Sequence, residues 1–232
     1  MRNYLSFIFS IFIFQSIFSQ ETLNSEFTNL FNGQNLDGWH LDVPKLDKNP
    51  NLPNPFVVRD GMLTTLAKPW GHIITDKTYQ NYRLTLEYRF SGKPKNSGVL
   101  VHVSTPRVFF GIWPKSIECQ MLHKNVGDLY CIGENVEVPD MVARRGPEKK
   151  WGVDGFKARR IKKLVDAEKP AGEWNTYVIE CFGNEIKVWL NGTLVTHGFN
   201  LTATSGQIAL QAEGSEVEFR KVVLQPISKL SH

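Results

Sequence analysis

Residues 174–196 read WNTYVIECFGNEIKVWLNGTLVT, three runs of alternating apolar and polar residues joined by two short turns. Because successive side chains of a strand point to opposite faces, each run predicts a strand with one buried face. Gly183-Asn184 and Asn191-Gly192 are typical of hairpin turns, where Gly and Asn accept the left-handed conformation. The stretch therefore predicts a three-stranded antiparallel meander.

The same pattern continues on the N-terminal side of this meander and beyond it. Residues 82–90 alternate strictly, and Asp60-Gly61 separates two apolar runs, which is a strong hairpin signal. Further short strands are expected at 56–59, 62–66, 97–103, 116–123, 206–214 and 217–224. Many short strands without a long amphipathic helix favour two packed antiparallel sheets. We therefore expect an all-β fold, a jelly-roll β-sandwich.

The N-terminus carries an apolar run, residues 5–18, made almost entirely of Phe, Ile and Leu. This run is too short and too near the N-terminus for a membrane span, and it ends in small and polar residues. It predicts a secretory signal peptide over residues 1–20, with an uncleaved anchor as the alternative. We expect a single mature domain, residues 21–232, that has no membrane span and is secreted or periplasmic.

Charge and cysteine content exclude several other classes of protein. A formal net charge of +4 is too weak to indicate a nucleic-acid partner. The three cysteines, Cys119, Cys131 and Cys181, cannot form a complete disulfide framework, and their spacing lacks the close pairs of a structural zinc site. Cys119 and Cys181 lie in apolar strand patterns, so buried free thiols are expected, although a Cys119–Cys131 pair stays open.

Two of the predicted strands carry polar side chains among apolar ones: SGVLVHV at 97–103 and SIECQMLH at 116–123. Glu118 and Gln120 share one strand face. The alternation sets His102 opposite the valines of its strand, and His123 would reach the face of Glu118 only if a bulge intervenes. We expect the polar face to form the floor of a sugar-binding groove.

Two irregular segments lie beside these strands. The aromatic loop 109–114 contains Trp113, which could stack on a sugar or anchor the loop to the core. The basic segment 133–172 shows no strand period, and a loop of this length is uncommon in a compact domain. It could be a rim for an electron-rich substrate, but a solvated insertion is favoured because most charge runs are solvated.

Several short motifs together resemble the 3-keto-disaccharide hydrolase domain family. They follow one another in order between residues 27 and 226: LFNG at 30–33, LDGW at 36–39, NSGV at 96–99, ECQ at 118–120, GDLY at 127–130, GEWN at 172–175, WLNG at 189–192, GQIALQ at 206–211 and VEFR at 217–220. The resemblance implies a concanavalin A-like lectin and glucanase sandwich. Two departures are the long basic segment 133–172 and His102, where relatives often carry Arg.

The resemblance also implies a reaction, the cleavage of an oligosaccharide or glycoside already oxidised to a ketone at sugar carbon 3. Such a ketone acidifies the proton on carbon 2, and its removal lets the bond at carbon 1 break by elimination. Water can then add to the unsaturated product. The reaction needs a base near carbon 2, an acid for the leaving oxygen and a positive or hydrogen-donating group at the enolate oxygen.

The candidates for these roles come from the predicted strands, and a half-buried structural role is the alternative for each. Carboxylate and imidazole groups can reach a working pKa through burial and neighbours, which makes Glu118, His102 and His123 the candidate base and acid. The candidate substrate-binding residues are Gln120, Gln211, Glu213, Arg89 and Trp113. Arg89 would steady the enolate. A divalent cation could do so instead, although no spacing indicates a metal site and no other cofactor is expected.

Two other classes of protein remain as alternatives. A conventional retaining glucanase of this architecture would need two carboxylates about 5 Å apart, and the strand 116–123 offers only Glu118. A non-catalytic carbohydrate-binding domain would need only the polar groove with Trp70, Trp113 and Trp151.

Overall fold

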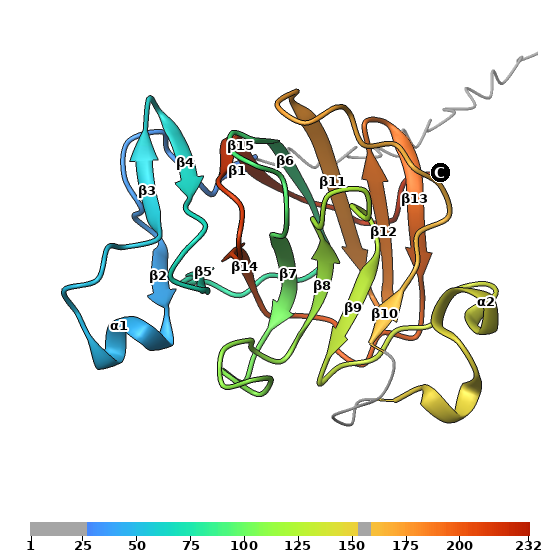
Figure 1. Ribbon diagram of the computed structural model, residues 1–232. Helices are drawn as coiled ribbons and strands as arrows, with labels where there is room; N and C mark the ends of the chain where they lie inside the picture. The colour runs from blue at the N-terminus through green and yellow to red at the C-terminus, as the bar shows by residue number, and fades with distance from the viewer. Residues whose placement is uncertain (1–26, 153–158) are drawn as a thin grey trace, which may run out of the picture.

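The computed structural model describes residues 27–152 and 159–232 (Figure 1). The predicted signal peptide, residues 1–20, lies outside these ranges. Within them, no helix is both long enough and apolar enough to cross a membrane.

Two antiparallel sheets form the described part of the chain (Figure 1). One has the order β13-β12-β11-β6-β15-β4-β3, with β1 also pairing β15, and the other has the order β10-β9-β8-β7-β14-β5-β2. We call them the eight-stranded and the seven-stranded sheet. The predicted all-β jelly-roll sandwich with a concanavalin A-like fold is confirmed.

The eight-stranded sheet contains β1 Thr28–Asn29, β3 Phe56–Arg59, β4 Met62–Thr65, β6 Tyr82–Phe90, β11 Asn175–Phe182, β12 Glu185–Leu190, β13 Thr193–Gly198 and β15 Val217–Pro226. The seven-stranded sheet contains β2 Trp39–Asp42, β5 Gly71–Thr75, β7 Gly98–Val103, β8 Ser116–Gln120, β9 Leu129–Ile132, β10 Arg160–Ile161 and β14 Gln207–Ala212.

The core lies between the two sheets and follows the predicted alternation. Along β6, every second residue from Tyr82 to Phe90 is buried, and the residues between them are half-buried. The facing strands β7 and β8 contribute Val99, Val101, Ile117 and Cys119 to the same cluster. Two predicted hairpins are also present, with positive φ angles of 51° and 83° at Asn191 and Gly192 and of 51° and 72° at Asp60 and Gly61.

Helices contribute little to the fold. The chain has α1 Pro44–Lys48, α2 Met141–Arg145 and the 3₁₀ turn η1 Glu148–Lys150. Figure 1 shows α1 and α2 at opposite ends of the molecule, so neither covers the outer face of a sheet. On the outer face of the seven-stranded sheet, Phe109, Ile112 and Trp113 form an apolar cluster with Ile74, Leu100 and Ile132, so the loop that carries them covers part of this face.

In its described residues, 133–152 and 159–172, the basic segment has more regular structure than the sequence indicates. It contains α2, η1 and β10, and the side chains of Arg144 and Arg145 are buried. Arg144 donates to the carbonyl of Lys162 and Arg145 donates to Oδ1 of Asn135. The expectation of a solvated insertion is wrong for these two arginines, whose guanidinium groups donate to oxygen atoms of the chain itself, whereas Lys150 and Lys162 are exposed.

All three cysteines are buried free thiols, as expected. Burial raises the pKa of Cys119 well above its usual value and the pKa of Cys181 to about 12. Because the thiolate is the reactive form, the native protein should not react with a disulfide reagent such as 5,5′-dithiobis(2-nitrobenzoate). In denaturant we expect all three thiols to react with the reagent. Rapid labelling of the native protein would contradict this prediction.

Candidate functional site

A pocket of about 420 Å³ lies on the outer face of the seven-stranded sheet, and we call it the groove. Its floor comes from β8, β9 and the residues that flank β7 and β14. Its walls come from the aromatic loop 109–114 and Trp70. The lining residues are Trp70, Asn96, Phe109, Phe110, Ile112, Trp113, Glu118, Gln120, Leu122, Tyr130, Ile132, Arg159 and Glu213. The structure thus brings four of the predicted site residues together: Trp113, Glu118, Gln120 and Glu213.

Glu118 lies at the centre of the floor, paired across the sheet with Leu100 on β7 and Tyr130 on β9. Its side chain extends over Gly98, the next residue along β7 on the same face. A Cβ atom on Gly98 would lie 2.6 Å from Oε1 of Glu118 and 2.5 Å from Oε1 of Gln211. The glycine therefore makes the space in which these two side chains meet.

Glu213 supplies a second carboxyl group. It directly follows β14 and pairs with Asn96, the second residue before β7. Burial and the charge of Glu213 raise the pKa of Glu118 to about 8, against the opposing effects of Gln211 and Arg159. Burial raises the pKa of Glu213 to about 7. Two coupled carboxyl groups that hold protons near neutral pH are typical of acid–base sites.

Gln120 is held in one orientation by its own backbone turn. Its Oε1 accepts hydrogen bonds from the N–H groups of Met121 and Leu122, both at 2.8 Å. These bonds identify the carbonyl end of the amide, so the Nε2 group is the end that can donate to a ligand in the groove. Gln211 is buried, and its Oε1 has no hydrogen-bond partner among the described residues.

The walls of the groove are aromatic and basic. Trp113 is nearly buried, whereas Trp70 is 44% exposed and Phe110 is 76% exposed. The guanidinium of Arg159 stacks on the ring of Phe109 at 3.6 Å. The basic segment therefore contributes a cation to the groove. The sequence did not identify Arg159 as a site residue, because the basic run around it shows no strand alternation. Tyr130 and Asn96 were not predicted as site residues either, although both lie in motifs that support the family resemblance.

His102 does not lie in the groove, which corrects the expectation from alternation. Its backbone has a φ of +55°, and the register of β7 with β14 shifts beside it. The ring is fully buried against Tyr82 of the core, and Nδ1 lies 2.8 Å from the carbonyl oxygen of Ala203. Burial lowers its pKa. This irregularity turns the imidazole into the sandwich, away from Glu118.

His123 and Arg89 also lie outside the groove. His123 follows the end of β8, and its Nδ1 is 3.0 Å from Oε1 of Glu168. Arg89 belongs to the eight-stranded sheet, where it donates to Glu218 at 2.7 Å and stacks on Trp174. The residue is outward-facing as predicted, but it faces outward from the other sheet, so the expected contact with an enolate is wrong.

A buried polar cluster next to the groove was not predicted. His72 is fully buried on β5 and is the cross-strand partner of Gln211, and its Nε2 lies 3.3 Å from Oδ2 of Asp42. Although burial opposes it, contacts with His72 and Arg107 hold the pKa of Asp42 below its usual value. Sequence patterns show only isolated polar residues here, because β2 and β5 are short strands.

The described ranges contain no group of three or more His, Cys, Asp or Glu side chains arranged to hold a metal ion. Trp151, which the binding-domain alternative invoked, donates to the carbonyl of Gly146 at 2.8 Å and is not a groove residue.

Comparison with known proteins gives one family match. Residues 26–225 match the family model of 3-keto-alpha-glucoside-1,2-lyase-like domains. A search of curated proteins finds no match.

Three solved structures illustrate the likeness of fold. A proposed glycosyl hydrolase of Parabacteroides distasonis superposes with a TM-score of 0.60 at 20% identity, over 87% of this chain and 94% of the other. A β-glucanase of Bacillus licheniformis gives a TM-score of 0.53 at 15% identity, over 89% and 100%. A carbohydrate-binding module of Bacillus subtilis gives 0.54 at 8%, over 81% and 95%. At these identities the likeness is one of fold.

Proposed function

The chain belongs to the family of 3-keto-alpha-glucoside-1,2-lyase-like domains, and on this premise we propose that it cleaves glycosides that carry a ketone at sugar carbon 3. The proposed reaction is proton abstraction at carbon 2, elimination at carbon 1 and rehydration. The apolar N-terminal run supports a place of action outside the cytoplasm.

The observation that carries this proposal is the pair of carboxyl groups in an aromatic groove, of which Glu118 is buried and Glu213 is half-buried. A base works best when its pKa lies near the operating pH. We assign proton abstraction at carbon 2 to Glu213, which is the more exposed of the two carboxyl groups and has a pKa raised to about 7. We assign protonation of the leaving oxygen to Glu118, because its deeper burial favours the protonated form.

The remaining groups of the groove complete the reaction. As the proton leaves carbon 2, negative charge develops on the ketone oxygen, which the Nε2 group of Gln120 and the guanidinium of Arg159 can stabilise. The bond between carbon 1 and the leaving oxygen then breaks, and that oxygen takes the proton of Glu118. Addition of water across the new double bond gives net hydrolysis.

A conventional glycosidase is the second candidate, and one observation favours it. Glu213 supplies the second carboxyl group that the strand 116–123 lacks, since it directly follows β14, which lies two positions from β8 in the sheet. Two carboxyl groups could protonate and displace a glycosidic oxygen without any ketone. The third candidate function is that the groove binds a sugar without cleaving it.

Incubation with matched disaccharides distinguishes these functions. We expect the protein to cleave 3-keto-disaccharides and to leave the unoxidised forms intact, as followed by chromatography of the products. Equal cleavage of both forms would indicate the conventional glycosidase, and binding without cleavage of either would indicate a sugar-binding domain. Parallel reactions with a chelator test the need for a divalent cation.

A further inference from the structure

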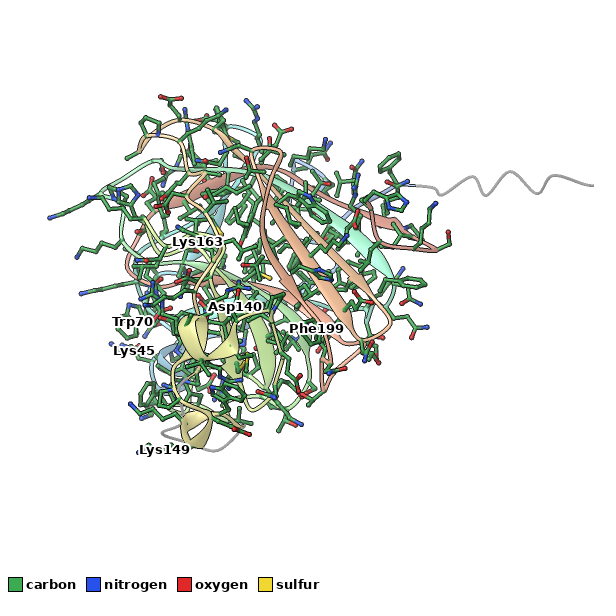
Figure 2. All side chains as sticks on the ribbon, turned by 90° about the vertical axis from the view of Figure 1, so that its right-hand side faces the viewer. Lys45, Trp70, Asp140, Lys149, Lys163 and Phe199 are labelled. Carbon is green, nitrogen blue, oxygen red and sulfur yellow. The ribbon has the colours of Figure 1, made fainter. Side chains whose placement is uncertain are left out.

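A second pocket adjoins the groove, and its chemistry differs from that of the groove floor. It has a volume of about 250 Å³ and is lined by Pro44, Lys45, Lys68, Pro69, Trp70 and Ile112. Trp70 and Ile112 line both pockets, so the two are neighbours. Figure 2 shows Trp70 and Lys45 together at one edge of the molecule. We call this space the side pocket.

The walls of the side pocket suit an aromatic ring better than a sugar. Its volume is below the range of about 300–1,000 Å³ typical of whole-ligand sites, so it holds about one ring. Pro44 and Pro69 offer no backbone N–H, and Ile112 has no polar side-chain group. A pyranose would therefore leave most of its hydroxyl groups without partners, which costs binding energy. A flat apolar ring could stack on Trp70, which is 44% exposed.

The rim of the side pocket is positively charged. Neither Lys45 nor Lys68 has an acidic partner among the described residues, and both are exposed. The nearby carboxylates of Asp42 and Asp47 are both paired with Arg107. The uncompensated charge at the rim is thus that of two ammonium groups, which attract an anionic substituent.

We propose that the side pocket binds the leaving group of the substrate, and that the preferred leaving group is a phenol ring bearing a carboxylate. The inference rests on the proposed function, since the sugar with its ketone would occupy the groove beside Glu118 and Glu213. The elimination needs no further reactant: the electron pair of the broken bond at carbon 1 stays on the phenol oxygen, which takes a proton.

Calorimetry with unoxidised glucosides tests the side pocket without any reaction. We expect 4-carboxyphenyl glucoside to bind more tightly than phenyl glucoside, and phenyl glucoside more tightly than methyl glucoside. Trp70→Ala should weaken binding of both aryl glucosides by about tenfold more than it weakens binding of methyl glucoside, since Trp70 also lines the groove that takes the sugar. The double variant Lys45→Ala, Lys68→Ala should remove the advantage of the carboxylate, about two- to tenfold in Kd.

Lys48→Ala is the matched control, because Lys48 is an exposed lysine of α1 that does not line the side pocket. Equal binding of aryl and methyl glucosides, or an equal effect of Trp70→Ala on both, would overturn the proposed leaving-group site. Loss of the carboxylate preference in Lys48→Ala would overturn the role of Lys45 and Lys68.

Turnover of the corresponding 3-keto glucosides separates this proposal from the proposed function. If the protein binds aryl glucosides as expected but cleaves none of their 3-keto forms, the proposed function fails and the side pocket stands. If it cleaves 3-keto phenyl and 3-keto methyl glucosides with equal KM and binds phenyl and methyl glucosides equally tightly, the proposed function stands and the side-pocket proposal fails.

Discussion

Replacing Gly98 with alanine is expected to abolish cleavage while the protein still folds. The new Cβ atom would lie 2.6 Å from Oε1 of Glu118 and 2.5 Å from Oε1 of Gln211, closer than non-bonded atoms approach. Both oxygens are at the ends of flexible side chains, so they can rotate away without disturbing β7. A displaced carboxyl group loses its acid–base role, which is worth about 10²- to 10⁴-fold in rate.

The measurement is kcat/KM for a 3-keto-disaccharide, together with circular dichroism and thermal unfolding of the same variant. Gly92→Ala is the matched control, because a Cβ atom there would meet only the Cβ of Glu216 at 3.4 Å, an ordinary contact. We expect the control to retain activity. Full activity in Gly98→Ala would mean that the meeting of Glu118 and Gln211 over this residue is not needed for cleavage.

Much of the fold follows from local sequence patterns. The alternation of residues 82–90 predicted the buried face of β6, and Asn191-Gly192 predicted the turn between β12 and β13, because each depends on neighbouring residues alone. His102 shows where this reasoning fails. Its positive φ angle of 55° breaks the alternation within a strand, and no residue type marks that position in advance.

The candidate site depends on which strands become neighbours, and local patterns do not contain that information. Arg89 was predicted to face outward and does so, but a sandwich has two outer faces and alternation does not distinguish them. Glu118 and Glu213 are brought together because β14 and β8 both pair with β7. This long-range pairing gives the groove its second carboxyl group, which the strand of Glu118 alone does not supply.

Glu118→Gln is expected to lower kcat by about 10²- to 10⁴-fold while sugar binding is retained. The amide has nearly the shape of the carboxyl group and can still hydrogen-bond a hydroxyl, but it cannot transfer a proton to the leaving oxygen. Glu216→Gln is the control, since Glu216 pairs with Arg59 on the surface. Rate constants and calorimetric Kd values check this prediction, and an active Glu118→Gln variant would exclude Glu118 as the acid.

The same substitution is expected to change how the free energy of unfolding depends on pH. Burial and the charge of Glu213 raise the pKa of Glu118 from 4.5 to about 8 in the folded protein. Between these values the unfolded chain has released a proton that the folded chain retains, so this residue makes the free energy of unfolding fall as pH rises. Well below pH 4.5 Glu118 is protonated in both states and does not change the pH dependence. Glutamine does not titrate.

Glu118→Gln should therefore be more stable than the parent at pH 8, by an amount on the order of a few kcal/mol, and closely similar to it at acidic pH. Urea unfolding of both proteins from pH 4.5 to pH 8 measures the difference, and parallel curves would show that Glu118 titrates alike in the folded and unfolded states. If the variant is more stable and less active than the parent, the buried carboxyl group of Glu118 destabilises the fold and is kept for activity. Replacing a purely structural residue would instead make the protein less stable.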